Sequence, residues 1–177
     1  LVAFCHVADS TSAQAENPLV QQRKLLSELK RIREANGFLQ KQVAAALDWS
    51  VSKVIRIENG AVGISKSDLI ALLHHYRVTD QERVEKLLDM ARMSRQSAWW
   101  DKYKDKYPQQ FINFIAFESS AHLIRTFHGL IMPGLLQTRD YAKLIIELYA
   151  SEPDKINRGI EVRLERQEQV LERPDPP

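Results

Sequence analysis

The stretch from Phe38 to Gly60 reads FLQKQVAAALDWSVSKVIRIENG and decides the fold of the N-terminal half of the chain. Apolar residues recur at helical spacing on either side of Asp48-Trp49-Ser50, which interrupts the pattern. We therefore expect two short helices joined by a tight turn, the first over 40–47 and the second beginning after Ser50, a good N-cap residue. Asn59-Gly60 can adopt the left-handed conformation that ends a helix, so the second helix is expected to stop there.

Three further helices are expected around this pair. One covers 20–36, with Leu25, Leu29 and Ile32 as its inward stripe. Another covers 65–76 and is capped by a serine. The last runs to Met93, with Thr79 as its N-cap in a capping box. The sequence thus predicts a mainly α-helical protein whose residues 20–93 form a five-helix domain.

The helical pair resembles the helix-turn-helix of phage-repressor-like (XRE-type) DNA-binding proteins. Many relatives carry Gly at the position of Asp48, and Asp tolerates positive φ better than most residues. Many also carry Ser or Thr at the position of Leu39, so that cap is absent here. The alternative is an ordinary helical hairpin inside a structural bundle. The residues that carry the resemblance are Gln40, Val43, Ala44, Leu47, Val54, Ile57, Glu58, Asn59 and Gly60.

The resemblance implies that the second helix of the pair enters the major groove of double-stranded DNA. It also implies a structural ion pair between Arg33 and Glu58. Side chains placed to reach base edges are those of Ser50, Val51, Ser52 and Arg56. Side chains expected to hold phosphates are those of Gln40, Lys53 and Asn59.

Charge is distributed unevenly along the chain. The segment 20–66 holds nine basic and four acidic residues, whereas the whole chain of 177 residues has a net charge of only +2. A locally basic segment on a nearly neutral chain is typical of a phosphate-contacting module joined to another domain. The single cysteine excludes an internal disulfide. With no apolar run of membrane-spanning length, we expect a cytoplasmic protein without membrane association.

Two segments flank the five-helix domain. Residues 1–19 are expected to form a flexible N-terminal arm, in which Cys5-His6 has no evident partners for a metal site. Residues 94–108, SRQSAWWDKYKDKYP, form a connector in which aromatic and basic residues alternate. This interleaving can indicate binding to single-stranded nucleic acid. The interpretation that we favour is that the aromatic residues dock on the second domain.

Residues 109–177 predict a second, α or α+β domain that looks incomplete. Pro133-Gly134 forces a turn. A helix is expected from Asp140 with Tyr141, Leu144, Ile145 and Leu148 facing inward, and a charged helix is expected over 154–172. An exposed apolar stripe on that last helix would need a partner or a dimer mate.

A second resemblance involves this C-terminal region. The residues Glu118 and Ala121, the run Pro133-Gly134-Leu135-Leu136-Gln137-Thr138, and Tyr141-Ala142 follow a repressor-like domain and a Trp-Trp connector. This combination resembles the WhiJ-like family of actinobacterial regulators. That family implies a transcriptional regulator with a C-terminal sensing or interaction domain, often encoded beside a small partner protein as in toxin–antitoxin pairs. Candidate residues for binding a ligand or partner are Glu118, Pro133, Gly134, Gln137 and Tyr141.

The chain shows no motif of an enzyme. It lacks the phosphate-binding, dinucleotide-binding, zinc-protease and nucleophile-elbow patterns, and we expect no cofactor or metal. The leading hypothesis is a sequence-specific, dimeric transcriptional regulator whose C-terminal region receives a signal from a protein or a small ligand. The alternative is an antitoxin-like interaction module that holds a small neighbour-encoded protein and binds DNA for autoregulation.

Overall fold

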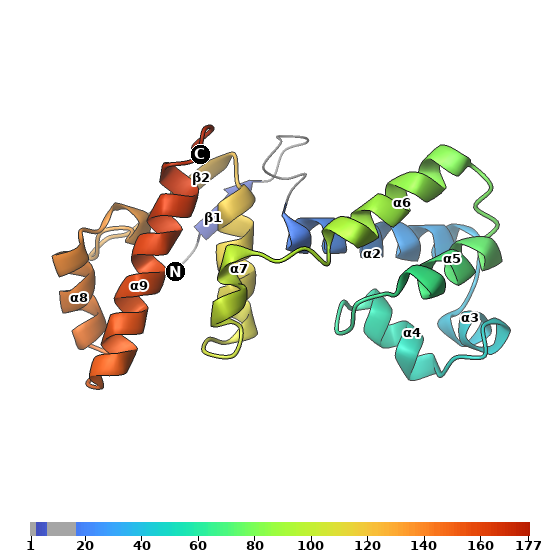
Figure 1. Ribbon diagram of the computed structural model, residues 1–177, viewed down its shortest axis with the longest axis horizontal. Helices are drawn as coiled ribbons and strands as arrows, with labels where there is room; N and C mark the ends of the chain where they lie inside the picture. Colours follow the sequence, from blue (N-terminus) through green and yellow to red (C-terminus); the bar gives the residue numbers. More distant parts are fainter. Residues whose placement is uncertain (1–2, 7–16) are drawn as a thin grey trace. The chain divides into compact units, whose positions relative to one another are not determined.

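A computed structural model of the protein describes residues 3–6 and 17–177 (Figure 1). Within these residues the chain is mainly helical, as predicted, and divides into two compact units. The N-terminal unit ends at Asp101. The C-terminal unit comprises strand β1 (Ala3–His6) and the chain from Lys102 to Pro177.

The N-terminal unit contains the five predicted helices. They are α2 (Pro18–Ala35), α3 (Gln40–Ala46), α4 (Val51–Glu58), α5 (Lys66–His75) and α6 (Gln81–Met93). Ser50 and Ser65 cap α4 and α5, because each hydroxyl accepts a backbone N–H three residues later. The prediction of Thr79 as the cap of α6 is wrong. Asp80 takes that role, since its carboxylate accepts from the first free N–H groups of the helix, at Glu82 and Arg83.

A single apolar core holds these five helices together. The helix α2 packs on α6 and α4, and α3 packs on α4. Arg83 of α6 also donates to Glu28 of α2 at 2.6 Å, and Glu28 accepts from Arg31 at 2.7 Å. The buried residues of this core are Leu25, Leu26, Leu29, Ile32, Val43, Ala44, Val54, Ile57, Ile64, Leu69, Leu72, Leu73, Tyr76, Leu87 and Ala91.

The turn between α3 and α4 has the conformation that the sequence requires. Asp48 has φ +53°, in the left-handed region that this residue type tolerates. Trp49 follows with its N–H bonded to the carbonyl of Ala44 at 2.8 Å, and its half-buried ring packs on the core. At the other end of α3, Leu39 has no capping side chain. Instead the Leu39 N–H donates to the side chain of Gln42 at 2.8 Å.

The C-terminal unit combines helices with a small sheet. After the 3-10 helix η1 (Trp99–Tyr103) come α7 (Gln109–Ser120), β2 (Leu123–Thr126), the 3-10 helix η2 (Gly134–Leu136), α8 (Arg139–Glu147) and α9 (Pro153–Leu171). The strands β1 and β2 pair antiparallel, with Ala3 opposite Thr126 and His6 opposite Leu123. Residues 3–6, expected in a flexible arm, thus form a strand. Asn17 caps α2 and Pro18 and Leu19 belong to that helix, so the predicted arm is also too long at this end. Residues 1–2 and 7–16 of the arm, and the Cys5 and His6 side chains, lie outside the described part.

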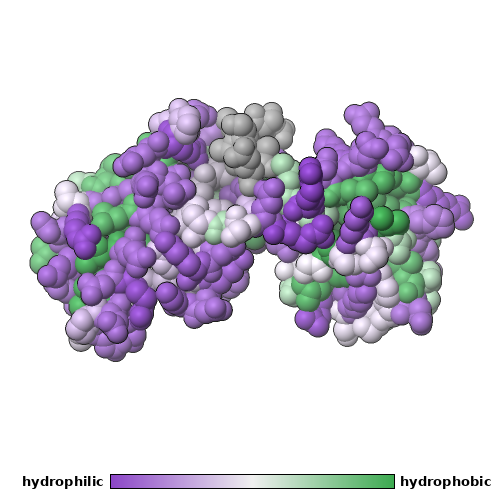
Figure 2. All heavy atoms as spheres, viewed as in Figure 1, coloured by the Kyte–Doolittle hydropathy of each residue, from purple (hydrophilic) through white to green (hydrophobic). Residues whose placement is uncertain are grey.

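The helix α9 is the centre of the C-terminal unit, since α7, η2 and α8 all pack against it. Ala142 of α8 is fully buried, and a Cβ at Gly159 of α9 would lie only 3.1 Å from the Ile146 side chain. This close approach sets which face of α8 is inward. The prediction that Leu144 and Leu148 face inward is therefore wrong. They are 64% and 70% exposed. Figure 2 shows apolar residues among the polar ones at the surface of the region where Figure 1 draws α8.

Candidate nucleic-acid interface

The helix α4 has one buried face and one exposed face. Val54 and Ile57 are each 3% exposed and belong to the core. The four residues predicted to reach base edges, Ser50, Val51, Ser52 and Arg56, are all exposed. These four residues form a short polar surface with one cation and one apolar side chain, a composition that base-edge recognition in a major groove uses. Ile55, 38% exposed, is a second apolar side chain on the exposed part of α4.

Arg56 is the cation of this surface. Among the described residues none forms an ion pair with its guanidinium. Its backbone carbonyl accepts from Ala61 at 2.9 Å in the turn that ends α4. The N–H donors of the guanidinium are therefore exposed to solvent, and Arg56 would not have to break an ion pair in order to bind a base.

The end of α4 is closed by the predicted residues. Asn59 is exposed and follows the last helical residue, and Gly60 has φ +71°. The Gly60 N–H bonds to the carbonyl of Ile57 at 2.9 Å. With Gly60 in the left-handed conformation that ends the helix, the side-chain amide of Asn59 faces solvent, in keeping with the phosphate contact predicted for it.

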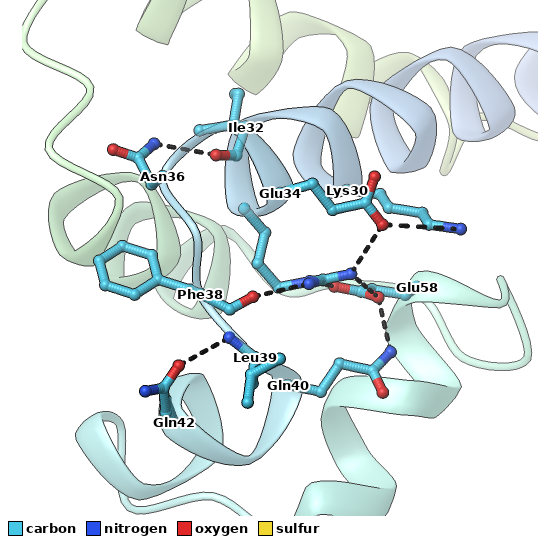
Figure 3. A network of polar contacts seen from close by, with 10 residues as sticks. Lys30, Ile32, Glu34, Asn36, Phe38, Leu39, Gln40, Gln42 and Glu58 are labelled. Atoms are coloured by element: carbon cyan, nitrogen blue, oxygen red, sulfur yellow. Dashed lines mark hydrogen bonds and ion pairs between the residues drawn. The ribbon is translucent and has the colours of Figure 1, made fainter.

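A network of polar contacts fixes α4 to α2 and α3 (Figure 3). Arg33 donates from Nε to Glu58 Oε1 at 2.5 Å and from Nη2 to Oε2 at 3.2 Å, and both side chains are only 8% exposed. Arg33 Nη1 also donates to the carbonyl of Phe38 at 2.8 Å. The hydrogen bonds to Glu58 raise the pKa of Arg33 above its usual value. The ion pair thus joins the end of α4, helix α2 and the chain entering α3.

Gln40 belongs to the same network. Its amide nitrogen donates to Glu58 Oε2 at 2.7 Å, so the donor predicted to hold a phosphate already has an anionic partner inside the domain. The side chain is half-buried. Gln40 stays a predicted phosphate contact, but a contact through this nitrogen has to share or replace the bond to Glu58.

Lys53 also has partners. Its Nζ donates to Asp68 Oδ1 at 3.0 Å and lies 3.9 Å from the centre of the Trp49 ring. Asp68 lies in the first turn of α5, where its N–H donates to Ser65 Oγ at 3.0 Å. The ammonium predicted to hold a phosphate therefore bridges α4 to α5. Sequence reasoning does not find Asp68, because it lies fifteen positions further along the chain on another helix.

The candidate ligand residue Glu118 is occupied inside the C-terminal unit. Arg166 of α9 donates to both its carboxylate oxygens, at 2.7 and 2.8 Å, and the two side chains are 4% and 9% exposed. The guanidinium also lies 5.1 Å from the centre of the Phe114 ring. Glu118 thus anchors α7 to α9 and is closed off from solvent.

The motif Pro133–Thr138 is also part of the interior framework. Gln137 is 4% exposed; it donates to the carbonyl of Met132 at 2.6 Å and accepts from Arg163 of α9. Gln167 donates to the carbonyls of Gly134 and Gln137, at 3.0 and 2.7 Å. Pro133 begins η2. The motif is therefore a loop fastened to α9.

Tyr141, the last of the five candidate ligand residues, serves the same loop. Its hydroxyl oxygen accepts the N–H of Met132 at 3.3 Å. A Cβ at Gly134 would lie 3.2 Å from the guanidinium of Arg163, so this position favours the absence of a side chain. The residues of α9 that organise these contacts are Arg163, Arg166 and Gln167. The sequence offers one sign of them, namely polar residues on the inward face of a helix.

Aromatic residues of the connector 94–108 are built into the structure. Trp100 is 6% exposed, and Tyr103 is 1% exposed with its hydroxyl donating to Glu165 of α9 at 2.5 Å. The Tyr107 ring packs against the Phe111 ring at a tilt of 33°, with ring centres 4.8 Å apart. Buried rings cannot serve as a platform for unpaired bases. Tyr103 and Tyr107 make their contacts within the C-terminal unit, which favours docking over binding of single-stranded nucleic acid.

Comparison with known protein families divides the chain in two. Residues 25–87 match a helix-turn-helix domain family, and residues 111–177 match a domain of unknown function, DUF5753. No curated protein and no solved structure matches the chain. None of the described helices is long and apolar enough to cross a membrane, and no group of three or more metal-ligating side chains is found among the described residues. The N-terminal unit therefore carries a helix-turn-helix domain, which points to a DNA-binding regulator rather than an enzyme.

Proposed function

We propose that the protein is a sequence-specific transcriptional regulator that inserts the first turn of α4 and Arg56 into the major groove. The observation that carries the proposal is the exposed polar face of a recognition helix whose opposite face and C-terminal end are fixed, by the core and by the buried Arg33–Glu58 pair. A rigidly held helix can place donors on base edges with the precision that sequence readout requires. Such a regulator would act in the cytoplasm, where the DNA lies.

The four base-contacting residues have different tasks in this proposal. Arg56 donates two hydrogen bonds to O6 and N7 of a guanine, and Val51 contacts a thymine methyl group. Ser50 and Ser52 use their hydroxyl groups on base edges or nearby phosphates. The protein binds as a homodimer on two half-sites, because one small module gives limited specificity.

The C-terminal unit receives the regulatory signal in this proposal, and a protein surface is the best-supported route. Its exposed apolar residues include Leu144, Leu148 and Tyr149, which are 64%, 70% and 80% exposed. The five candidate ligand residues are used within the fold, so they would hold a ligand only after rearrangement. The same observation supports the antitoxin-like alternative, in which a small neighbour-encoded protein binds this unit and DNA binding serves autoregulation.

The test of the proposed function is selection of bound sites from a random DNA library, followed by measurement of the Arg56→Ala variant. We expect an enriched sequence with two-fold symmetry. Removing Arg56 should lose about 1–3 kcal/mol of discrimination at one base position in each half-site. Arg92→Ala, at an arginine of α6 that is 72% exposed, is the matched control and should bind as the unchanged protein does. Equal selectivity of the Arg56 variant would contradict the assignment of this residue.

The two functional hypotheses separate in a second experiment. The Leu144→Lys and Leu148→Lys changes lie on the exposed side of α8, so the fold should survive them. If the main task is to hold a small partner, these changes abolish co-purification of the neighbour-encoded protein and leave selection of DNA sites intact. Full regulation in cells that express the variant without the partner would count against the antitoxin-like hypothesis.

A further inference from the structure

We propose that Lys53 is a positioning residue and not a phosphate ligand, and that Asp68 is a determinant of DNA specificity because it holds Lys53. The proposal rests on the proposed function, since it assigns roles within the same recognition surface. The three side chains concerned, Lys53, Asp68 and Trp49, come from α4, α5 and the turn before α4. We call them the α4–α5 latch.

Both ends of Lys53 are used to fix the first turn of α4. Its backbone N–H donates to Ser50 Oγ at 3.1 Å, which caps the helix. Its ammonium donates to Asp68 at 3.0 Å and lies over the Trp49 ring at 3.9 Å, a distance at which a cation is attracted by the ring face. The first turn of α4, which carries Ser50, Val51 and Ser52, is therefore fixed by the cap within the helix and by the contact of Lys53 with α5.

The acidic end of the latch is itself rigid. Asp68 lies in the first turn of α5, where the N–H groups of a helix favour a negative charge. Its own N–H donates to Ser65 Oγ at 3.0 Å, and the carboxylate side chain is only 26% exposed. Lys53 thus meets a fixed acceptor, and it would have to leave both this acceptor and the ring in order to reach a phosphate.

The latch has an electrostatic consequence for DNA binding. Non-specific affinity comes from cations that neutralise phosphates, and each such contact adds about 0.9 to the slope of log affinity against log salt concentration. A lysine that is neutralised by Asp68 adds little to this sequence-independent attraction. The latch therefore aligns Ser50, Val51 and Ser52 for base readout while it keeps one cation away from indiscriminate phosphate binding.

Two variants of the full chain test the proposal, each measured on the selected site and on a scrambled duplex over a range of salt concentrations. Asp68→Asn releases the ammonium. We expect the slope on scrambled DNA to steepen by about 0.9, and the ratio of specific to non-specific affinity to fall about tenfold, the size of one lost base contact. The double variant Lys53→Met with Asp68→Asn removes both charges. We expect it to keep the slope of the unchanged protein and to show the reduced ratio.

Further variants separate positioning from general damage. Lys53→Arg keeps a cation for Asp68 and the ring, and it should retain most of the ratio of specific to non-specific affinity that the unchanged protein shows. The matched control is the double change Lys86→Met with Asp89→Asn, which removes one charge of each sign from exposed positions on α6 and should alter neither slope nor ratio. Circular dichroism verifies that every variant is folded.

The possible outcomes are distinct. If the double variant loses about 0.9 of slope and binds both duplexes more weakly with an unchanged ratio, Lys53 is a phosphate ligand and the proposal is overturned. An unchanged ratio in both variants overturns the positioning role as well. If the unchanged protein selects no sequence from the library, the proposed function itself fails and takes this inference with it. If the unchanged protein selects a sequence but the Lys53 and Asp68 variants keep its ratio of specific to non-specific affinity, only this inference is overturned.

Discussion

Replacing Arg33 by Met should destabilise the N-terminal unit far more than the ion pair contributes to its stability. The change keeps the unbranched stem of the side chain and removes its charged guanidinium group. Glu58, 8% exposed, then retains the amide of Gln40 at 2.7 Å as a donor but no cation. Breaking a buried pair in this way costs about 3–5 kcal/mol. The carbonyl of Phe38 also loses its donor from Arg33, so we expect a total cost of about 4 kcal/mol.

The double variant of Arg33→Met with Glu58→Met removes both charges. We expect it to be more stable than the single variant and to fall about 1–2 kcal/mol below the unchanged protein, because only the neutral amide and carbonyl remain unpaired. The increase in the free energy of unfolding from the single to the double variant is the diagnostic quantity. It measures the cost of burying the Glu58 carboxylate without a cation, and not the contribution of the ion pair.

Urea unfolding followed by tryptophan fluorescence measures these effects in the full chain. All three tryptophans, Trp49, Trp99 and Trp100, lie in the N-terminal unit, so their emission reports on that unit. A loss of 4 kcal/mol lowers the urea midpoint by about 2–4 M for a domain of this size. Arg31→Met is the matched control at a side chain 67% exposed, and it should leave the urea midpoint close to that of the unchanged protein, because exposed ion pairs contribute little to stability. If Arg33→Met resembles this control, or if the double variant is less stable than the single one, the reasoning is wrong.

Three further predictions concern stability. The hydrogen bond from Arg31, aided by a second arginine, lowers the pKa of Glu28 from 4.5 to about 2, so the stability that this carboxylate contributes is present above pH 4.5 and lost as the pH falls toward 2. In urea titrations at pH 5 and pH 3, Glu28→Gln should reduce the difference between the two free energies of unfolding by about 1 kcal/mol. An equal difference in the variant and the unchanged protein would refute this prediction. Asp48→Gly should raise the free energy of unfolding by up to about 1 kcal/mol, and with it the thermal midpoint, because φ is +53° and the side chain is exposed. A lower midpoint would count against the left-handed turn. Arg166→Met should strand Glu118 and accelerate hydrogen exchange in α7 and α9 by the equivalent of about 3–5 kcal/mol, whereas unchanged protection would show that the pair is dispensable.

The N-terminal unit could be predicted in detail because its determinants are local. Helical periodicity, serine caps and the Asn59-Gly60 ending fix α4 within one short stretch. Pairing Arg33 with Glu58 depends on the resemblance, since nothing local links residues that are 25 positions apart. The error at Thr79 arises because two adjacent residues are both good caps, and only the backbone geometry decides between them.

The C-terminal unit could be predicted only in outline. The helices α8 and α9 follow from apolar spacing, whereas α7 is not predicted from the sequence. The roles of Glu118 and Gln137 depend on Arg166 and Arg163, which are 48 and 26 positions away. The inward face of α8 is set by close packing at Gly159, and a pattern of leucines does not reveal this. The pairing of residues 3–6 with 123–126 spans most of the chain, so no local signal predicts it.

That pairing matters for anyone who divides the protein into pieces. The strand β1 precedes the helix-turn-helix unit in the sequence and β2 follows it, so the DNA-binding module is an insertion within the chain of its neighbour. A fragment that starts at Lys102 carries β2 with a newly bared edge, whose backbone groups are a ready template for joining another chain. Self-association of such a fragment would be an artefact of excision, and fusing residues 3–6 back ahead of it should suppress the association.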